Sequence, residues 1–132
     1  MVICKPDAVE RGLVGEILGR LERRGLRLAR AELRTIDKEL ASAHYAEHAG
    51  KPFYDELIAY ITRGPAMFAV FEGPEGTVQV VRQTMGATNP ANAAPGTIRG
   101  DLAVSMPDNL IHGSDSPGSA RREVALFFPG LV

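Results

Sequence analysis

The residues best suited to chemistry lie in one stretch near the C-terminus, Asn109-Leu110-Ile111-His112-Gly113-Ser114-Asp115-Ser116. It places a histidine after a short apolar run and before a polar turn. Ser116 followed by Pro117 is typical of a helix N-cap with proline at the first helical position, where its missing N–H costs nothing. His112 therefore precedes a helix N-terminus, whose unpaired N–H groups favour anions such as phosphate. A histidine in this position can be a general base, a metal ligand, a core residue or a nucleophile.

A second stretch, from Gly86 to Gly100, is rich in glycine, proline, asparagine and alanine and has almost no apolar periodicity. It is too long to be a simple connection, which points to a functional loop. The other two histidines, His44 and His48, lack surroundings like those of His112.

Composition limits the classes of protein to consider. The chain has 132 residues, of which 45% are hydrophobic and 23% charged, with a net charge of -1 and one cysteine, Cys4. This predicts one globular domain over residues 1–132, without a disulfide framework. The charge balance argues against nonspecific binding to nucleic acid or membranes. No leader or membrane-spanning run is evident, so we expect a cytoplasmic protein.

Apolar periodicity predicts four strands and five helices. Residues 26–36 alternate between apolar and polar with one slip, which permits a β-bulge. The order of the elements predicts an α+β fold, a ferredoxin-like sandwich in which helices cover one face of a four-stranded antiparallel sheet. The expected strands are 1–4, 26–36, 67–71 and 110–112, and the expected helices are 12–24, 37–48, 53–63, 77–85 and 117–128.

Six sequence blocks together resemble nucleoside diphosphate kinases. Each block is weak alone, but their order and spacing extend over nearly the whole chain. The resemblance implies the same ferredoxin-like fold. The blocks are Lys5-Pro6-Asp7-Ala8-Val9, His44-Tyr45, Lys51-Pro52-Phe53, Gly86-Ala87-Thr88-Asn89-Pro90, Pro95-Gly96-Thr97-Ile98-Arg99-Gly100-Asp101 and the stretch Asn109–Ser116.

The resemblance implies that His112 is a nucleophile. It would take the γ-phosphoryl group from a nucleoside triphosphate, typically ATP, and pass it to a nucleoside diphosphate in a ping-pong reaction through a phosphohistidine. Glu123 and Ser114 match the residues that hold this histidine. Without the resemblance, Glu123 would be interpreted as an ordinary exposed helix carboxylate.

The resemblance also implies a nucleotide site. Lys5, Arg82 and Arg99 match phosphate-contacting cations, although by themselves they would be interpreted as solvated surface charges. Base stacking accepts any base, which implies broad base specificity. Mg²⁺ is expected to arrive with the nucleotide phosphates rather than in a protein cage. The remaining matches are hydroxyls at Thr88 and Tyr45, a base-stacking ring at Phe53, ribose contacts at Asn109 and Lys5, and Met106 opposite the base, which could equally be a core residue.

Two other classes of function remain open. A catalytically silent oligomeric scaffold would be expected to have lost His112, Lys5 or Arg99, and all three are present. A ferredoxin-like RNA- or nucleotide-binding module usually has strand aromatics and a basic balance, whereas this chain has 6% aromatic residues and a net charge of -1. We therefore expect nucleotides as partners, with no specific nucleic acid and no membrane. The resemblance further implies a homo-oligomer, and we favour a hexamer over a tetramer.

Overall fold

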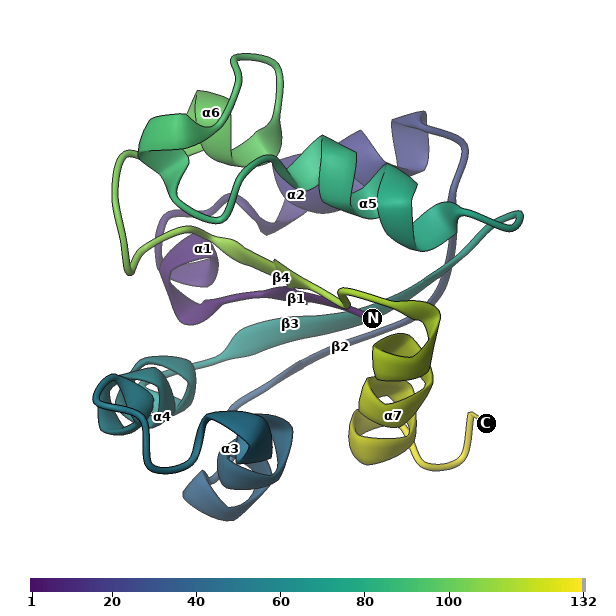
Figure 1. The fold of residues 1–132 in the computed structure, drawn as a ribbon. Coiled ribbons are helices and arrows are strands. Elements are labelled where there is room, and N and C mark those ends of the chain that lie inside the picture. The colour runs from purple at the N-terminus through teal and green to yellow at the C-terminus, as the bar shows by residue number, and fades with distance from the viewer. Residues whose placement is uncertain (132) are drawn as a thin grey trace.

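Four antiparallel strands form one sheet in the computed structural model, which describes residues 1–131. The strands are β1 (Val2–Cys4), β2 (Arg27–Arg34), β3 (Ala66–Glu72) and β4 (Ile111–Gly113), in the order β2-β3-β1-β4. Ile3 of β1 pairs with Phe68 on one side and with His112 on the other. The predicted antiparallel α+β architecture is therefore confirmed, and the predicted nucleophile lies on the edge strand β4 (Figure 1).

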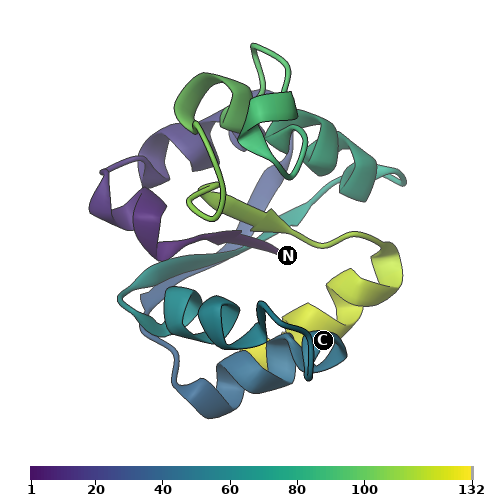
Figure 2. The ribbon, with the colours of Figure 1, turned by 60° about the vertical axis from the view of Figure 1, so that its left-hand side comes forward.

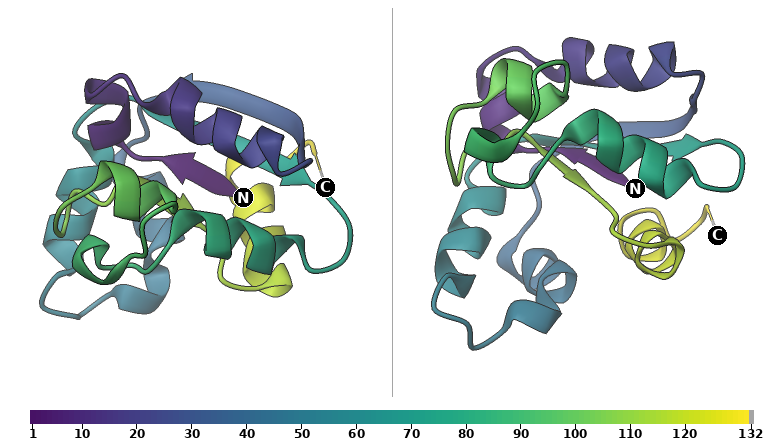
Figure 3. Two further views of the ribbon diagram at one scale, coloured as in Figure 1. Left: turned by 90° about the horizontal axis from the view of Figure 1, so that it is seen from above. Right: turned by 45° about the horizontal axis from the view of Figure 1, so that its top comes forward.

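Helices cover both faces of the sheet, so the expectation that they cover only one is wrong (Figures 1 and 3). One face carries α1 (Pro6–Glu10), α2 (Val14–Arg23), α5 (Thr77–Met85) and α6 (Ile98–Leu102). The other carries α3 (Lys38–His44), α4 (Tyr54–Thr62) and α7 (Pro117–Phe127), and Figure 2 shows the two groups well separated.

The two-sided arrangement follows from the central strands, which are apolar on both faces. Val2 and Cys4 pack into the core beside α2 and α5, while Ile3 and Phe68 pack into the core beside α4 and α7. A strand that is apolar at every position must be covered on both sides, because either bare face would leave apolar area in water.

The predicted helix and turn signals behave as expected. The Asp37 side chain accepts a hydrogen bond from Leu40 N at 2.8 Å, which caps α3, and Ser116 Oγ accepts one from Ser119 N at 3.0 Å, which caps α7. Gly25 ends the α2 region with φ 90°, a conformation that glycine adopts without strain. The slip in strand 26–36 is a break in register between Leu28 and Arg30.

Two short helices were not predicted. α1 begins at Pro6, soon after the predicted strand 1–4, and α6 lies mostly within the predicted loop, where the Thr97 side chain accepts from Gly100 N. The long predicted helix 37–48 is also divided, because α3 ends at His44 and a 3₁₀ turn covers Ala46–His48. Within residues 1–131, no helix is both long and apolar enough to cross a bilayer.

Candidate active site

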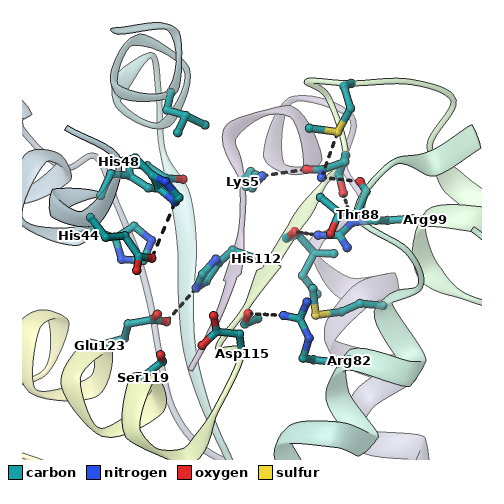
Figure 4. A pocket seen from close by; sticks show the side chains of 18 of the residues that line it. Lys5, His44, His48, Arg82, Thr88, Arg99, His112, Asp115, Ser119 and Glu123 are labelled. Atoms are coloured by element: carbon teal, nitrogen blue, oxygen red, sulfur yellow. Dashed lines mark hydrogen bonds and ion pairs between the residues drawn. The ribbon is translucent and has the colours of Figure 1, made fainter. Parts of the chain in front are cut away.

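A pocket of about 290 Å³ opens where the end of β1, the α3–α4 segment, α5, the loop before β4, and the start of α7 meet (Figure 4). Every side chain that the sequence resemblance assigned to a site lines this pocket, with the exception of Ser114. Ser114 lies directly behind the wall, buried against Glu123. The predicted residues, which are spread from position 5 to position 123, are therefore brought together in one place.

His112 is held on one side by Glu123. Its Nε2 lies 2.7 Å from Glu123 Oε1, and the Ser114 hydroxyl donates to the same oxygen at 2.9 Å. The alternation of β4 explains this meeting: Ile111 packs into the α2–α5 core, so His112 and Ser114 face the opposite side, where α7 presents Glu123. A carboxylate can only accept from Nε2, so this contact places the ring proton on Nε2 and leaves the lone pair on Nδ1.

Glu123 remains ionised in this environment. Burial raises the pKa of the Glu123 carboxyl, but the hydrogen bonds from His112 and Ser114 and the nearby imidazole charge outweigh burial and lower the pKa to about 2. The carboxylate is almost fully buried, whereas the His112 side chain is partly exposed. The pair therefore combines a fixed internal anion with a histidine that solvent can reach.

Lys5 reaches the pocket from the end of β1. Its Nζ donates to Asn109 Oδ1 at 2.7 Å, while Asn109 Nδ2 donates to the Thr88 carbonyl at 2.9 Å and contacts Met106 Sδ at 3.5 Å. Burial, followed by repulsion from Arg99, lowers the pKa of Lys5 to about 8. The ammonium is thus held where its charge is disfavoured until an anion arrives.

Arg99 is buried and points three of its N–H groups at backbone carbonyls. Nε donates to Asn109 O at 3.1 Å, Nη1 to Gly86 O at 3.0 Å and Nη2 to Ile111 O at 2.5 Å. Burial, and then the neighbouring Arg82, lowers the pKa of Arg99 to about 10. A guanidinium has five N–H groups, so within residues 1–131 two of them remain for a ligand. Arg99 thus also links the start of β4 to the loop at Gly86 through hydrogen bonds, a role that its sequence position did not reveal.

Arg82 extends from α5, and Gly113 allows that helix to lie against β4. A Cβ at Gly113 would lie 2.4 Å from Met85 Sδ, so any side chain there would have to displace the buried side chain of Met85. In the present packing, Arg82 Nη1 donates to the Gly113 carbonyl at 3.1 Å. This glycine therefore has a packing role beside the site.

His44, which was not predicted to take part in the site, lies against His112. The His44 ring is buried, with its centroid 4.9 Å from that of His112 and the ring planes at 83°. Burial, and then the charge of His112, lowers the pKa of His44 to about 3, so this ring is neutral. His48 and Asp115 also line the pocket. The available signal was their spacing of four residues, which would place His44 and His48 on one face of the predicted helix 37–48.

Phe53 and Met106 stand at the rim of the pocket with large exposed fractions, 44% and 49%. The His48 ring lies 5.6 Å from that of Phe53, and Lys51 Nζ lies 5.8 Å from the Phe53 ring centroid. Exposed apolar side chains at the rim of a pocket can accept the face of a flat ring.

Comparisons with known proteins agree over the entire chain. A sequence model of the family described as nucleoside diphosphate kinase matches residues 1–131. The nucleoside diphosphate kinase of Mycobacterium leprae is 58% identical over 132 residues, covering 99% of this chain and 96% of that protein. The one from Thermomicrobium roseum is 58% identical over 128 residues, covering 97% and 85%. A halophilic nucleoside diphosphate kinase from Halobacterium salinarum, solved in complex with CDP, superposes with a TM-score of 0.93 at 52% identity, covering 96% of this chain and 84% of that one.

The low pKa of Glu123 predicts a specific acid dependence of stability. Because the pKa in the folded state lies at about 2, below the ordinary 4.5, the ionised carboxylate contributes stability that is present above about pH 4.5 and is lost as the pH falls toward 2. Glu123→Gln removes this titration. We therefore expect the free energy of unfolding, measured by urea denaturation, to depend less on pH in this window for the variant than for the wild type. Glu22→Gln, at an exposed position of α2, is the control and should follow the wild type. Identical pH profiles for wild type and Glu123→Gln would contradict the prediction.

Proposed function

The chain belongs to the nucleoside diphosphate kinase family, and we propose that His112 carries the phosphoryl group between the two nucleotides. The family's reaction moves the γ-phosphoryl group of a nucleoside triphosphate to a nucleoside diphosphate. One observation carries the assignment: Glu123 occupies Nε2 of His112, which leaves the Nδ1 lone pair beside a pocket lined by Lys5, Arg82 and Arg99.

In the first half-reaction, the His112 Nδ1 lone pair attacks the γ-phosphorus. A nitrogen–phosphorus bond forms as the bond to the bridging oxygen breaks, and the nucleoside diphosphate leaves with that electron pair. The imidazole keeps its Nε2 proton and gains positive charge, which the buried Glu123 carboxylate stabilises. A terminal phosphate oxygen of a second nucleoside diphosphate then attacks the phosphohistidine and regenerates the free ring.

Phosphoryl transfer depends mainly on positioning and on neutralising charge at the phosphate oxygens. We assign this task to Lys5, Arg82 and Arg99, with the hydroxyls of Thr88 and Tyr45 as additional donors. Mg²⁺ would arrive with the nucleotide and, when present, would neutralise part of the phosphate charge beside these cations. The chemistry of the pocket fits this arrangement, because its most buried carboxylate, Glu123, already accepts from His112 and Ser114.

The exposed apolar side chains at the rim of the pocket support a nucleotide bound with its base at the rim, and they support broad base specificity. We assign stacking on the base to Phe53, with Met106 on the opposite side, since stacking does not distinguish one base from another. We assign ribose hydroxyl contacts to Lys5 and Asn109. We further propose that residues 1–132 form a single nucleoside diphosphate kinase domain. We also propose that the protein acts in the cytoplasm.

The proposal is tested by trapping the intermediate. The wild type is incubated with Mg²⁺ and γ-labelled ATP without an acceptor, beside His112→Ala and the control Arg23→Ala, an exposed α2 residue. We expect acid-labile, alkali-stable label on the wild type and the control, and its transfer to added GDP. His112→Ala should stay unlabelled while retaining the wild-type circular dichroism spectrum. Equal labelling of His112→Ala, or no label on a folded wild type, would refute the assignment.

The low pKa of Lys5 predicts that nucleotide binding takes up a proton. Burial and Arg99 hold the pKa of Lys5 at about 8 in the free protein, and bound phosphate would raise it. Near pH 8, calorimetry of ADP binding in buffers of different ionisation enthalpy should therefore report proton uptake, and affinity should fall as the pH rises further. Lys5→Gln should abolish the uptake. A binding enthalpy independent of the buffer would contradict this prediction.

We propose that the chain assembles into a homo-oligomer, a hexamer rather than a tetramer. The support is β2, an edge strand with one unpaired side within the described sheet and with Leu33 54% exposed on it. Exposed edge strands favour pairing with a second copy. Light scattering coupled to gel filtration should give about six times the chain mass of 14.2 kDa. A mass of two or four chains would refute the hexamer.

A further inference from the structure

The backbone just before the nucleophile makes a strained turn. Leu110 has φ 72° and is the only non-glycine residue within 1–131 with a positive φ. Ile111 N donates to Asn109 O at 2.8 Å, so residues 109–111 form a three-residue γ-turn. The γ-turn with positive φ is the rare and strained form. The Leu110 side chain is fully buried and contributes to the apolar core. Leucine nevertheless disfavours a positive φ, because its Cβ comes too close to the following carbonyl oxygen.

The segment Lys5-Pro6-Asp7 binds this turn from both sides. The Asp7 carboxylate is 3% exposed, and its Oδ2 accepts from Leu110 N at 3.0 Å. Lys5 N donates to Leu110 O at 2.8 Å. Both backbone polar groups of the strained residue are therefore held by residues more than 100 positions earlier in the chain. An ionised acceptor makes a stronger bond to N–H than a neutral one, which suits it to holding a strained backbone.

The turn separates two sets of site contacts. On one side, Asn109 receives Lys5 Nζ on its side chain and Arg99 Nε on its carbonyl. On the other, Ile111 O accepts from Arg99 Nη2, and His112 follows immediately. A change at Leu110 would therefore move His112 relative to Lys5 and Arg99, the groups that must converge on one phosphate.

Asp7 has few other partners that would explain its burial. Among residues 1–131, its Oδ1 forms no hydrogen bond, and neither does the buried hydroxyl of Tyr60. The Tyr60 hydroxyl nevertheless faces Asp7, because burial and then hydrogen bonding to the Asp7 carboxylate raise the pKa of Tyr60. The bond from Leu110 N, at 3.0 Å, is thus the hydrogen bond of good geometry that this buried carboxylate accepts within residues 1–131, and burying a charge is an expensive arrangement for a residue that only fills space.

We propose that Asp7 is a positioning residue whose carboxylate holds Leu110 in the γ-turn and so sets the place of His112 relative to the phosphate-binding cations. This inference rests on the proposed role of His112. It differs from a purely structural role, because it predicts a loss of phosphoryl transfer greater than the loss of stability would cause.

The test compares Asp7→Ala, Asp7→Asn and the wild type by single-turnover phosphorylation of His112 at saturating MgATP, together with urea denaturation. Misplacement of reacting groups by about 1 Å can cost about 100-fold in rate. We expect Asp7→Ala to lower the saturated rate by about 10- to 100-fold. Asp7→Asn retains an acceptor oxygen and should keep most of the rate. Ile17→Val, a substitution in the core beside α2 and outside the pocket, is the matched control that lowers the urea midpoint without lowering this rate.

Repeating the comparison in a Leu110→Gly variant tests whether Asp7 acts through the turn. Glycine adopts a positive φ without the Cβ penalty, so the rate lost on Asp7→Ala should be smaller in a Leu110→Gly background than in the wild type. Asp7→Ser, whose hydroxyl is one bond shorter in reach, replaces Asp7→Ala if the latter does not fold.

Four outcomes are decisive. A wild-type saturated rate in Asp7→Ala, or the same loss in both backgrounds, would overturn the positioning role. A rate loss no greater than that of Ile17→Val would do the same. Failure of the wild type to label His112 would instead refute the proposed function, so the two failures are distinguishable.

Discussion

The contact between Glu123 and His112 is the interaction on which the site depends. A buried carboxylate is tolerated only when hydrogen bonds and nearby positive charge replace its lost hydration. Here Ser114 and His112 supply them, at 2.9 Å and 2.7 Å from the same oxygen. The same contact selects the ring nitrogen that faces the pocket. The same pairing therefore compensates the burial of Glu123 and orients the ring of His112, the residue proposed as the nucleophile.

The cations of the pocket repel one another. Burial and then Arg82 lower the pKa of Arg99, and burial and then Arg99 lower the pKa of Lys5. Groups with perturbed pKa values in one cavity are typical of a functional site. The protein offsets this repulsion with backbone carbonyls, three of which accept from Arg99. These bonds also hold β4 in place, so the stability of the site and its readiness for an anion come from the same contacts.

Much of the fold could be predicted from local patterns. The helix predicted at 77–85 coincides with α5, and the caps at Asp37 and Ser116 lie where expected. These features depend on hydrogen bonds within a few residues, which local side-chain types determine. The short helices α1 and α6 were missed because five residues carry too little periodicity to distinguish them from a loop. The prediction that helices cover only one face of the sheet was wrong, because the order of elements along the chain does not determine on which face each helix packs.

By itself, the sequence determined which chemical groups are available: a histidine before a capped helix, a loop rich in glycine and proline, and cations in a family pattern. Only the tertiary structure decided which nitrogen of His112 stays open, that Arg99 is largely occupied by carbonyls, and that His44 packs against His112. The physical reason is sequence distance. Lys5 meets Asn109, and Asp7 meets Leu110, across more than 100 residues. Such contacts depend on how two cores pack on one sheet, and no local pattern in the chain encodes that packing.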